Sequence, residues 1–563
     1  MLIMKNLFYS LLLSLCFGKS ENSTGLIHSA KISPYAQPNM AVTYYVHPQL
    51  GDDANAGTSK QHPFKTLQRL AQVSLHPGDT IALAANQTYN GSLQLMNQQG
   101  NEKMPIVITS IGWDEKNITK PATINFKSYA NGILIQDCSY ITLTNIALTG
   151  NGYEGENPAG NMRCGVLVSD ANAEKMTGIQ LSKLSIHDVY FENPGFIRDE
   201  NEVKSANGTQ RYGWGIRLIN KSADQVMENI QITDCEIANV SHTGIKLTGS
   251  KQNIREVKLL HNTVRYTGGP GMQMSEVQNV YVANNVIDHS GSKEDSRKWG
   301  RGSGLWTWGS TNVLIEKNKF LYANGPGDSD GAHIDFNCTN IVIQYNFSAY
   351  NAGGFCEILG NNYNCIYQYN ISVNDGYRVK GKNGAFQEGK TLWLSGFQGN
   401  NQKRKGPVNT YICNNTIYAD SSILPKVAFD NTSEEVLIAN NIFCIAHPFQ
   451  MVLGDQYKSD VKNNQLIKNM ELRNNLFLKP DSWPVELMPY EKNTFTGDPQ
   501  FKNPGGLNWD DYIPSNAMSI KNKGIPLPAI QLQLKDFPYT IQPVKDIFGK
   551  PVSAQPAIGA IEP

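Results

Sequence analysis

Three near-copies of one short unit follow one another in the middle of the chain, at residues 331–336, 353–358 and 376–381. Each copy opens with glycine and then alternates apolar and polar residues for about five positions, the pattern of a β-strand. Asp335 and Glu357 are 22 positions apart, and Glu357 and Lys380 are 23 apart. This spacing is typical of one coil of a parallel β-helix, in which equivalent strands stack ~4.8 Å apart. The repeat therefore predicts a solenoid.

A polar residue, nearly always Asn, follows the second strand of the unit from about residue 105 onward. These positions are Asn145, Asp234, Asn262, Asn285, Asn318, Asn346, Asn370, Asn415, Asn441 and Asn475. Stacked amides on successive coils can hydrogen-bond one another and hold tight turns. We therefore interpret these residues as architecture. Three longer segments, 191–212, 290–301 and 384–406, interrupt the repeat and are expected to wall a groove.

The region 44–95 predicts a cap for the first coil. It contains an expected strand at 44–46, an amphipathic helix over 63–73 and a strand at 80–83. Its segments Gly51-Asp52-Asp53, Pro63-Phe64-Lys65-Thr66-Leu67 and Pro77-Gly78-Asp79-Thr80-Ile81 resemble the N-terminal cap of secreted right-handed parallel β-helix proteins that act on polysaccharides. Segments 496–501 and 546–560 resemble the closing parts of the same proteins. The resemblance implies an all-β fold, a right-handed parallel β-helix with a short capping helix.

The expected boundaries are a signal peptide at 1–20, a linker at 21–42, the β-helix at 43–520 and a C-terminal closing segment at 521–563. Residues 1–20 carry Lys5, an apolar run and small residues placed like a cleavage site. We expect export to the periplasm or the medium. Cys16 offers a less favoured alternative as a lipid-anchored cysteine, because the Leu15 before it does not suit that site.

Charge is balanced, with 49 Lys and Arg against 49 Asp and Glu, and the isoelectric point is about 7.1. This argues against nucleic acid or an anionic membrane as the main partner. The apolar leader is too short to span a bilayer, and we expect a monomer. The eight cysteines after the leader match no zinc pattern and are predicted to be buried in the core rather than paired.

Two columns of outward side chains are predicted on the central coils. If Ile334, Phe336, Cys356, Ile358 and Val379 point inward, the outward pairs are His333 with Asp335, Phe355 with Glu357, and Arg378 with Lys380. Extending the same register backward places Arg217, Lys246, Gln273 and Trp306 before His333, and Thr248, Ser275 and Trp308 before Asp335.

Two carboxylates on neighbouring coils repel each other, so the pKa of one should rise as a general acid requires. Asp335 and Glu357 are therefore predicted to be the catalytic pair of a glycoside hydrolase. His333 is predicted to tune a carboxylate. Asp330 is a further catalytic candidate, and Asp328 in the same turn is also considered, although Asp-Ser-Asp-Gly is equally well explained as a turn.

The predicted substrate-binding residues are Trp306, Trp308, Trp393, Lys246, Arg378 and Lys380. Exposed tryptophans suit the CH-rich faces of sugars, and the Arg378–Lys380 pair suits the acid group of an acidic sugar. Arg378-Val379-Lys380 is similar to the Arg-x-Lys clamp of polygalacturonase-type glycosidases. The chain lacks that family's adjacent aspartates and its Gly-His-Gly, so only these two residues carry over.

The predicted partner is a plant or algal polysaccharide or oligosaccharide, and the hydrolase prediction requires no cofactor. Two alternatives remain open. A polysaccharide lyase would use Lys380 or Arg378 as the base and acidic residues to hold Ca²⁺. A glycan-binding β-helix without catalysis would need only the tryptophans and the groove.

Overall fold

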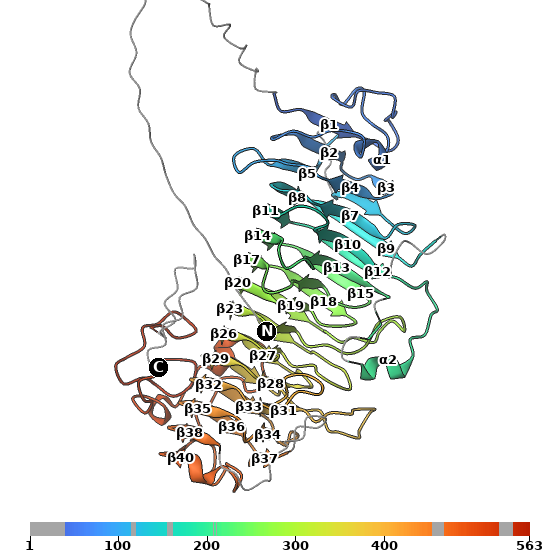
Figure 1. Ribbon diagram of the computed structural model, residues 1–563. Coiled ribbons are helices and arrows are strands. Elements are labelled where there is room, and N and C mark those ends of the chain that lie inside the picture. Colours follow the sequence, from blue (N-terminus) through green and yellow to red (C-terminus); the bar gives the residue numbers. More distant parts are fainter. Residues whose placement is uncertain are drawn as a thin grey trace, which may run out of the picture. The chain divides into compact units, whose positions relative to one another are not determined.

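A computed structural model describes residues 40–113, 120–154, 162–205, 208–209, 211–452, 467–527 and 544–563. The predicted signal peptide with Cys16 and nearly all of the predicted linker lie outside these residues. Within them the chain is almost entirely β, and the strands wind into one long solenoid of stacked coils (Figure 1). Every strand-to-strand pairing is parallel, so the predicted parallel β-helix is confirmed.

The described strands form three long sheets that make up the sides of the solenoid. The sheet that we call the groove sheet contains β4 (Leu93–Met96), β7 (Asn131–Gln136), β10 (Met162–Ser169), β13 (Tyr212–Ile219), β16 (Ile245–Thr248), β19 (Met272–Ser275), β22 (Leu305–Trp308), β25 (Ala332–Ile334), β28 (Gly354–Ile358), β31 (Lys390–Leu394), β34 (Lys426–Phe429) and β37 (Gln450–Met451).

The second sheet contains β1 (Thr43–Val46), β2 (Thr80–Ala84), β5 (Ile106–Ile111), β8 (Ile141–Thr144), β11 (Lys175–Ser182), β14 (Val226–Thr233), β17 (Ile254–Leu260), β20 (Val277–Ala283), β23 (Thr311–Glu316), β26 (Thr339–Gln344), β29 (Tyr363–Gln368), β32 (Val408–Cys413), β35 (Glu434–Ala439), β38 (Lys468–Arg473) and β40 (Glu491–Lys492).

The third, the flank sheet, contains β3 (Thr88–Asn90), β6 (Ala122–Asn125), β9 (Ile146–Asn151), β12 (Ser185–Tyr190), β15 (Glu236–Val240), β18 (Thr263–Thr267), β21 (Val286–Asp288), β24 (Lys319–Leu321), β27 (Phe347–Ala349), β30 (Ile371–Val373), β33 (Thr416–Ala419), β36 (Ile442–Ile445), β39 (Leu476–Phe477) and β41 (Phe495–Thr496). Short helices are α1 (Leu67–Leu70), α2 (Glu200–Lys204) and the 3₁₀ turns η1 (Met488–Tyr490), η2 (Trp509–Tyr512) and η3 (Ala517–Ser519).

The interior is a continuous column of aliphatic side chains. Inward positions of all three sheets, such as Ile245, Val280 and Ile186, have no exposed surface. The eight cysteines predicted to be buried are buried. The predicted first strand, helix and second strand correspond to β1, α1 and β2, although the helix is shorter than expected. Its apolar residues Leu67 and Leu70 are buried in the central core, as a cap for the first coil requires.

An asparagine ladder, defined here as Asn262, Asn285, Asn318, Asn346, Asn370, Asn415, Asn441 and Asn475, runs along one corner of the coils. Each amide Nδ2 donates to the Oδ1 of the next Asn at 2.8–3.0 Å. Their predicted architectural role is thus observed. Cys235 occupies the equivalent position one coil before the ladder, where its backbone N–H donates to Asn262 Oδ1, so Asn145 and Asp234 are not part of the ladder.

The segment after Gly497 lies along the flank of the solenoid, whereas an end closure was expected. Apolar residues of this segment, among them Phe501, Tyr512 and Ile558, pack on the outer face of the flank sheet at Phe347 and Ile371. That face is apolar at these strands, so covering it removes apolar surface from water.

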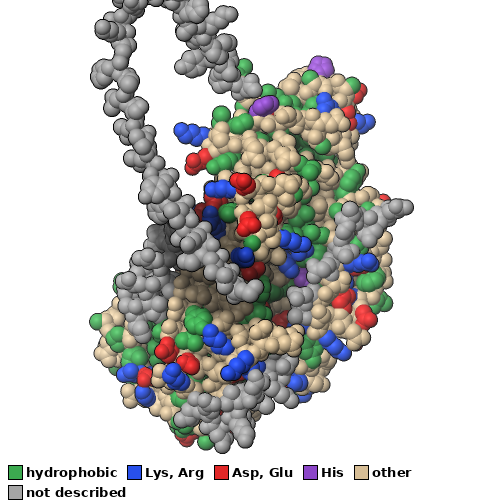
Figure 2. All heavy atoms as spheres, in the orientation of Figure 1, with side chains coloured by type: hydrophobic (Ala, Val, Ile, Leu, Met, Phe, Trp, Pro, Cys, Tyr) green, Lys and Arg blue, Asp and Glu red, His purple; other side chains and the backbone are tan. Residues whose placement is uncertain are grey.

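Charged side chains of both signs are spread over the visible face of the molecule, in keeping with the balanced composition (Figure 2). Among the described residues, no helix has the length and apolar character that crossing a bilayer requires.

Candidate functional site

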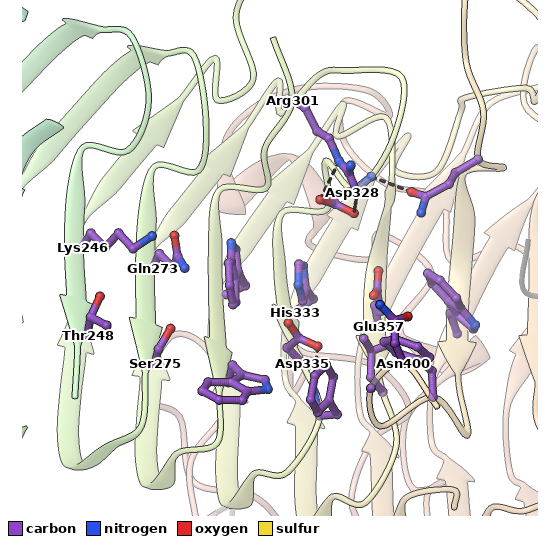
Figure 3. A pocket seen from close by; sticks show the side chains of 18 of the residues that line it. Lys246, Thr248, Gln273, Ser275, Arg301, Asp328, His333, Asp335, Glu357 and Asn400 are labelled. Atoms are coloured by element: carbon purple, nitrogen blue, oxygen red, sulfur yellow. Dashed lines mark hydrogen bonds and ion pairs between the residues drawn. The ribbon is translucent and has the colours of Figure 1, made fainter. Parts of the chain in front are cut away.

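A groove of about 730 Å³ runs across the outer face of the groove sheet. Its floor is one row of outward side chains from successive strands: Arg217, Lys246, Gln273, Trp306, His333, Glu357 and Trp393. A second row contains Thr248, Ser275, Trp308 and Asp335 (Figure 3). Each of the three predicted inserts contributes a lining residue, respectively Lys204, Arg301 and the group Gln387, Phe397 and Asn400. The expectation that they wall a groove is confirmed.

The register of the last two predicted coils is wrong. Ile334 pairs with Ile358, so Glu357 follows His333 and not Asp335. The two coils are offset by two more residues than expected, and this offset is already present at the bridge between Asp330 and Gly354. Phe355 packs in the core against Tyr367, with ring centroids 5.8 Å apart. Phe355 was predicted to point outward. Phe336, predicted to point inward, lines the groove because its strand ends at Ile334.

The third predicted unit, 376–381, is not a strand of the sheet. Glu357 pairs instead with Trp393 of β31, and residues 374–389 form a loop between the two coils. Arg378 is buried and donates to the backbone oxygens of Asp328, Gln387 and Gly325 at 2.7–3.2 Å. Lys380 and Val379 are exposed. Neither Arg378 nor Lys380 lines the groove, so the predicted clamp does not face the other site residues.

His333 lies at the centre of the groove floor, stacked parallel to Trp306 with ring centroids 6.0 Å apart. The Ser303 hydroxyl oxygen accepts the backbone N–H groups of Ser329 and Asp330 and lies 3.1 Å from His333 Nδ1. These two N–H groups occupy both lone pairs of the hydroxyl oxygen, so its one hydrogen is left to donate to Nδ1. The proton of a neutral imidazole is then on Nε2. Burial lowers the pKa of His333, although Asp330 and Asp328 oppose this shift. His333 is therefore a neutral donor.

Four carboxyl groups surround His333 in distinct environments. Glu357 is buried, and its burial together with the neighbouring Asp330 carboxyl raises its pKa well above the usual range. Asp330 is buried, with Oδ2 3.9 Å from His333 Nδ1, and is not part of the groove lining. Unlike Asp335 and Glu357, it therefore does not face the groove.

The other two carboxyls face the groove. Burial raises the pKa of Asp335 to about 7, although the Phe336 N–H donates to its Oδ1 at 2.8 Å. Asp328 has a side chain that is 32% exposed and binds Arg301 through both oxygens at 2.9 Å. Burial would raise its pKa, but the Arg301 guanidinium outweighs this and lowers it. Asp328 is thus ionised, while Asp335 can carry a proton near neutral pH.

Asp328 sits in a backbone turn with an unusual conformation. Asp328 and Ser329 have φ of +48° and +75°, a left-handed region in which residues other than glycine are strained. The turn is held by Gln387, whose Oε1 accepts the Asp328 N–H at 2.6 Å, and by Arg378. The Asp-Ser-Asp-Gly motif predicted the turn. Its partners Arg301 and Gln387 could not be predicted, because they belong to distant inserts and no local pattern shows that they contact Asp328.

Among the described residues, Asp330, His333 and Glu357 are a group that could hold a metal, with one ligand atom of each within 4.8 Å of the others. Ca²⁺ takes six to eight oxygen ligands, so two carboxylates and an imidazole suit it poorly. The set suits a transition ion better.

The two ends of the groove differ in character. Beyond Glu357, the aromatic side chains of Trp393, Phe336 and Phe397 pack with Leu359. Trp308 meets Phe336 edge-on at 5.8 Å, and its indole N–H has no hydrogen-bond partner in the described part of the chain. At the opposite end lie the cations Arg217 and Lys246. Predicted binding residues Trp306, Trp308, Trp393 and Lys246 therefore share one groove.

Comparison with known proteins matches residues 214–402 to the family model described as right handed beta helix region. The chain is 25% identical over 492 residues to a lacto-N-biosidase of Bifidobacterium longum subsp. longum, an alignment that covers 71% of this chain and 28% of that protein. It thus spans less than a third of the length of that relative.

Two crystal structures of the GH136 lacto-N-biosidase from Eubacterium ramulus are similar to it at 21% identity. The native protein gives a TM-score of 0.51 over 68% of this chain and 64% of that one, and the selenomethionine derivative gives 0.52 over 73% and 68%. The fold of this chain is therefore the right-handed parallel β-helix, shared with carbohydrate-active proteins of which lacto-N-biosidases are examples.

Proposed function

We propose that this protein is a glycoside hydrolase that binds an oligosaccharide along the groove and cleaves it beside His333. The observation that carries the proposal is the difference between two groove-facing carboxyls, Asp335 with a pKa of about 7 and Asp328 with a lowered pKa. Glycosidic cleavage needs one protonated and one ionised carboxyl, and a pair whose pKa values are pushed apart supplies both.

In this scheme Asp335 donates a proton to the leaving oxygen, and the Asp328 carboxylate acts on the other side of the bond as base or nucleophile. His333 Nε2–H is placed to hydrogen-bond a sugar hydroxyl. Glu357, the partner of Asp335 predicted from the sequence, is held protonated beside Asp330 and is proposed to position the sugar. Trp306 and Trp308 provide the stacking platform.

Similarity to the two lacto-N-biosidases supports a hydrolase and adds lacto-N-biose, the group in the name of these enzymes, to the substrates worth testing. The lyase alternative has lost its predicted bases, because Arg378 and Lys380 do not line the groove. A glycan-binding protein without catalysis would not need carboxyls in opposite ionisation states.

The test is a product analysis with plant and algal polysaccharides and with oligosaccharides that end in lacto-N-biose. We expect new reducing ends without unsaturated product, in the presence or absence of a chelator. Asp335→Asn protein serves as the blank. An ultraviolet-absorbing unsaturated product would show a lyase, and binding of glycans with no product would show a binding protein.

A further inference from the structure

Two cations lie side by side at one end of the groove floor. Arg217 on β13 and Lys246 on β16 are paired in register, so their side chains leave neighbouring strands ~4.8 Å apart. Both are more than nine-tenths buried, with 8% and 9% of their surface exposed, and both line the groove. Figure 3 shows Lys246 beside Gln273, in the same row as His333 and Glu357.

Neither cation has an anionic partner among the described residues. Arg217 stacks on Trp214, with the guanidinium carbon 4.4 Å from the ring centroid, and its Nε has no hydrogen-bond partner. The titratable groups that face Lys246 are Arg217, the Cys164 thiol and the buried His242, none of them a carboxylate. The pKa of Lys246 is lowered to about 7, mainly by burial and to a smaller extent by repulsion from Arg217.

Other buried arginines of this protein are fully engaged. Arg163 donates to four backbone oxygens, among them those of Gly150 and Phe126. Arg198 pairs with Glu192 and Glu202, and Arg301 pairs with Asp328. Burial of an unpaired charge is costly, and folded proteins avoid it unless something else supplies the partner. Arg217 and Lys246 are exceptions to the rule that this chain otherwise follows.

We propose that Arg217 and Lys246 form a subsite for an oxyanion carried by the substrate, a carboxylate or sulfate ester of an acidic sugar. The inference rests on the proposed function, whose substrate class it specifies. Arginine binds such groups with a planar fork and lysine with a point charge. The buried hydroxyl of Thr248, which also has no partner in the described residues, is a third donor beside them.

The subsite is separated from the cleavage position. Three strand steps, from β16 through β19 and β22 to β25, place Lys246 ~14 Å from His333. The acidic sugar therefore lies further along the glycan than the bond that is cleaved. The acidic substrate that was first predicted from Arg378 and Lys380 is thus assigned to different residues on the opposite side of the carboxyls.

Binding of an anion is coupled to the proton of Lys246. An anion stabilises the ammonium form and raises the pKa of Lys246 from its value in the free protein. Binding should therefore be tightest below pH 7 and weaken as the pH rises above it, with proton uptake on binding near pH 7. Arg217 stays charged throughout, so some affinity persists at higher pH.

The experiment compares wild-type protein with Arg217→Met and Lys246→Met. Arg265→Met on β18 and Lys258→Met on β17 are matched controls, because both residues are exposed on other sheets. Thermal unfolding is measured in sodium sulfate and in sodium chloride of equal ionic strength. Sulfate stabilises folded proteins in general, because it is excluded from their surface. We therefore expect sulfate to raise the Tm of every protein by more than chloride does, and this rise to be smaller in both test variants than in the wild type and the controls.

A second arm measures kcat/KM on matched neutral, uronate-bearing, sialylated and sulfated oligosaccharides. The ratio of acidic to neutral substrate should fall about 10- to 100-fold in the test variants, the loss of a charge-assisted hydrogen bond. The preferred acidic substrate tells a carboxylate from a sulfate. In the unliganded protein Lys246→Met should raise the Tm, because a buried unpaired charge is removed.

A sulfate effect as large in both variants as in the controls, or an unchanged acidic-to-neutral ratio, overturns the subsite. A lower Tm for Lys246→Met without sulfate also counts against it, because the lysine would then be a structural residue. If no glycan is cleaved while the sulfate effect still depends on Arg217 and Lys246, the hydrolase proposal fails and the anion subsite stands.

Discussion

The asparagine ladder and the groove share several coils, and both contain buried polar side chains. Asn346 is representative of the ladder: its Nδ2 donates to Ile315 O, Gln344 O and Asn370 Oδ1, and its Oδ1 accepts the backbone and side-chain N–H of Asn318. The groove instead keeps polar atoms without partners at Arg217 and Trp308 and carboxyls with displaced pKa values.

This contrast separates architecture from function. Full hydrogen bonding offsets the free-energy cost of desolvating a buried amide. A group that is unpaired, or whose pKa is displaced, instead lowers the stability of the fold, and packing elsewhere must compensate. Substitutions in the ladder should therefore destabilise the fold. Substitutions of the unpaired or electrostatically displaced groups in the groove should change activity and leave stability equal or higher. Substitution of Asp328 should also destabilise the fold, because the buried Arg301 would lose its ion-pair partner.

The largest effect is expected for Asp335→Asn. The amide keeps the shape of the side chain but cannot donate the proton, so kcat should fall about 10²- to 10⁴-fold while the Tm stays equal or rises. Asp328→Asn should cost a similar factor and Glu357→Gln less. Activity assays with circular dichroism melts measure both quantities, with Glu471→Gln on β38 as the control. If Glu357→Gln costs as much as Asp335→Asn and Asp328→Asn costs little, the pair predicted from the sequence is the catalytic one.

Asn346→Ala should show the opposite behaviour. It leaves several buried backbone and amide groups unpaired, each worth about 1–3 kcal/mol, so the free energy of unfolding should drop by about 3–5 kcal/mol. Asn340, whose amide belongs to a half-buried row with Asn312 and Asn364, is the matched comparison. Asn340→Gly should cost about 1 kcal/mol, because its neighbours can bond to water. Equal losses in urea titrations of the two variants would show that burial does not decide the cost.

The pH dependence follows from the raised pKa of Asp335. As a general acid it must be protonated, so kcat/KM should fall about tenfold per pH unit above pH 7. Its folded pKa lies above the unfolded value of 3.8, so its contribution to stability is complete below that value and is lost as the pH rises toward 7. Asp335→Asn should reduce this decline in Tm between about pH 4 and 7. If the fall in kcat/KM above pH 7 is unchanged in the Glu357→Gln and Lys246→Met variants, this fall is assigned to Asp335.

Trp308→Ala should weaken substrate binding about 5- to 10-fold, close to 1 kcal/mol for one lost stacking contact. Trp308→Phe keeps an aromatic face but lacks the indole N–H that has no protein partner. If the KM of the phenylalanine variant lies between those of the wild type and the alanine variant, this N–H donates to the sugar. Identical values for the two variants would show that stacking makes no contribution.

The alternation of apolar and polar residues predicted the fold and the outward direction of Trp306, Trp308 and His333, because a period of two residues fixes which face a side chain takes. It could not predict the coil length at each step. The coil that leads from His333 to Glu357 is two residues longer than the predicted spacing of 22, and the insert 374–389 delays the next strand until Lys390. Asp328 was only a secondary candidate, because its ionised state depends on the ion pair with Arg301. That pair joins two segments distant in sequence, and a local pattern cannot show it.

The smallest effect is expected for Lys380→Met, the substitution that the polygalacturonase-like clamp would make severe. Lys380 is exposed on the 374–389 loop, where its backbone N–H donates to Glu388, and it does not line the groove. Its loss should change kcat/KM by less than about twofold, in the range of ordinary surface substitutions, whereas Lys246→Met should alter the preference for acidic substrates. Arg378→Met is no substitute for this test, because Arg378 holds the Asp328 turn through backbone oxygens and its removal would disturb the carboxylate itself. Loss of turnover in Lys380→Met protein of unchanged Tm would mean that the loop folds over the bound glycan and brings the lysine to the reacting sugar, and the lyase mechanism would then replace the hydrolase.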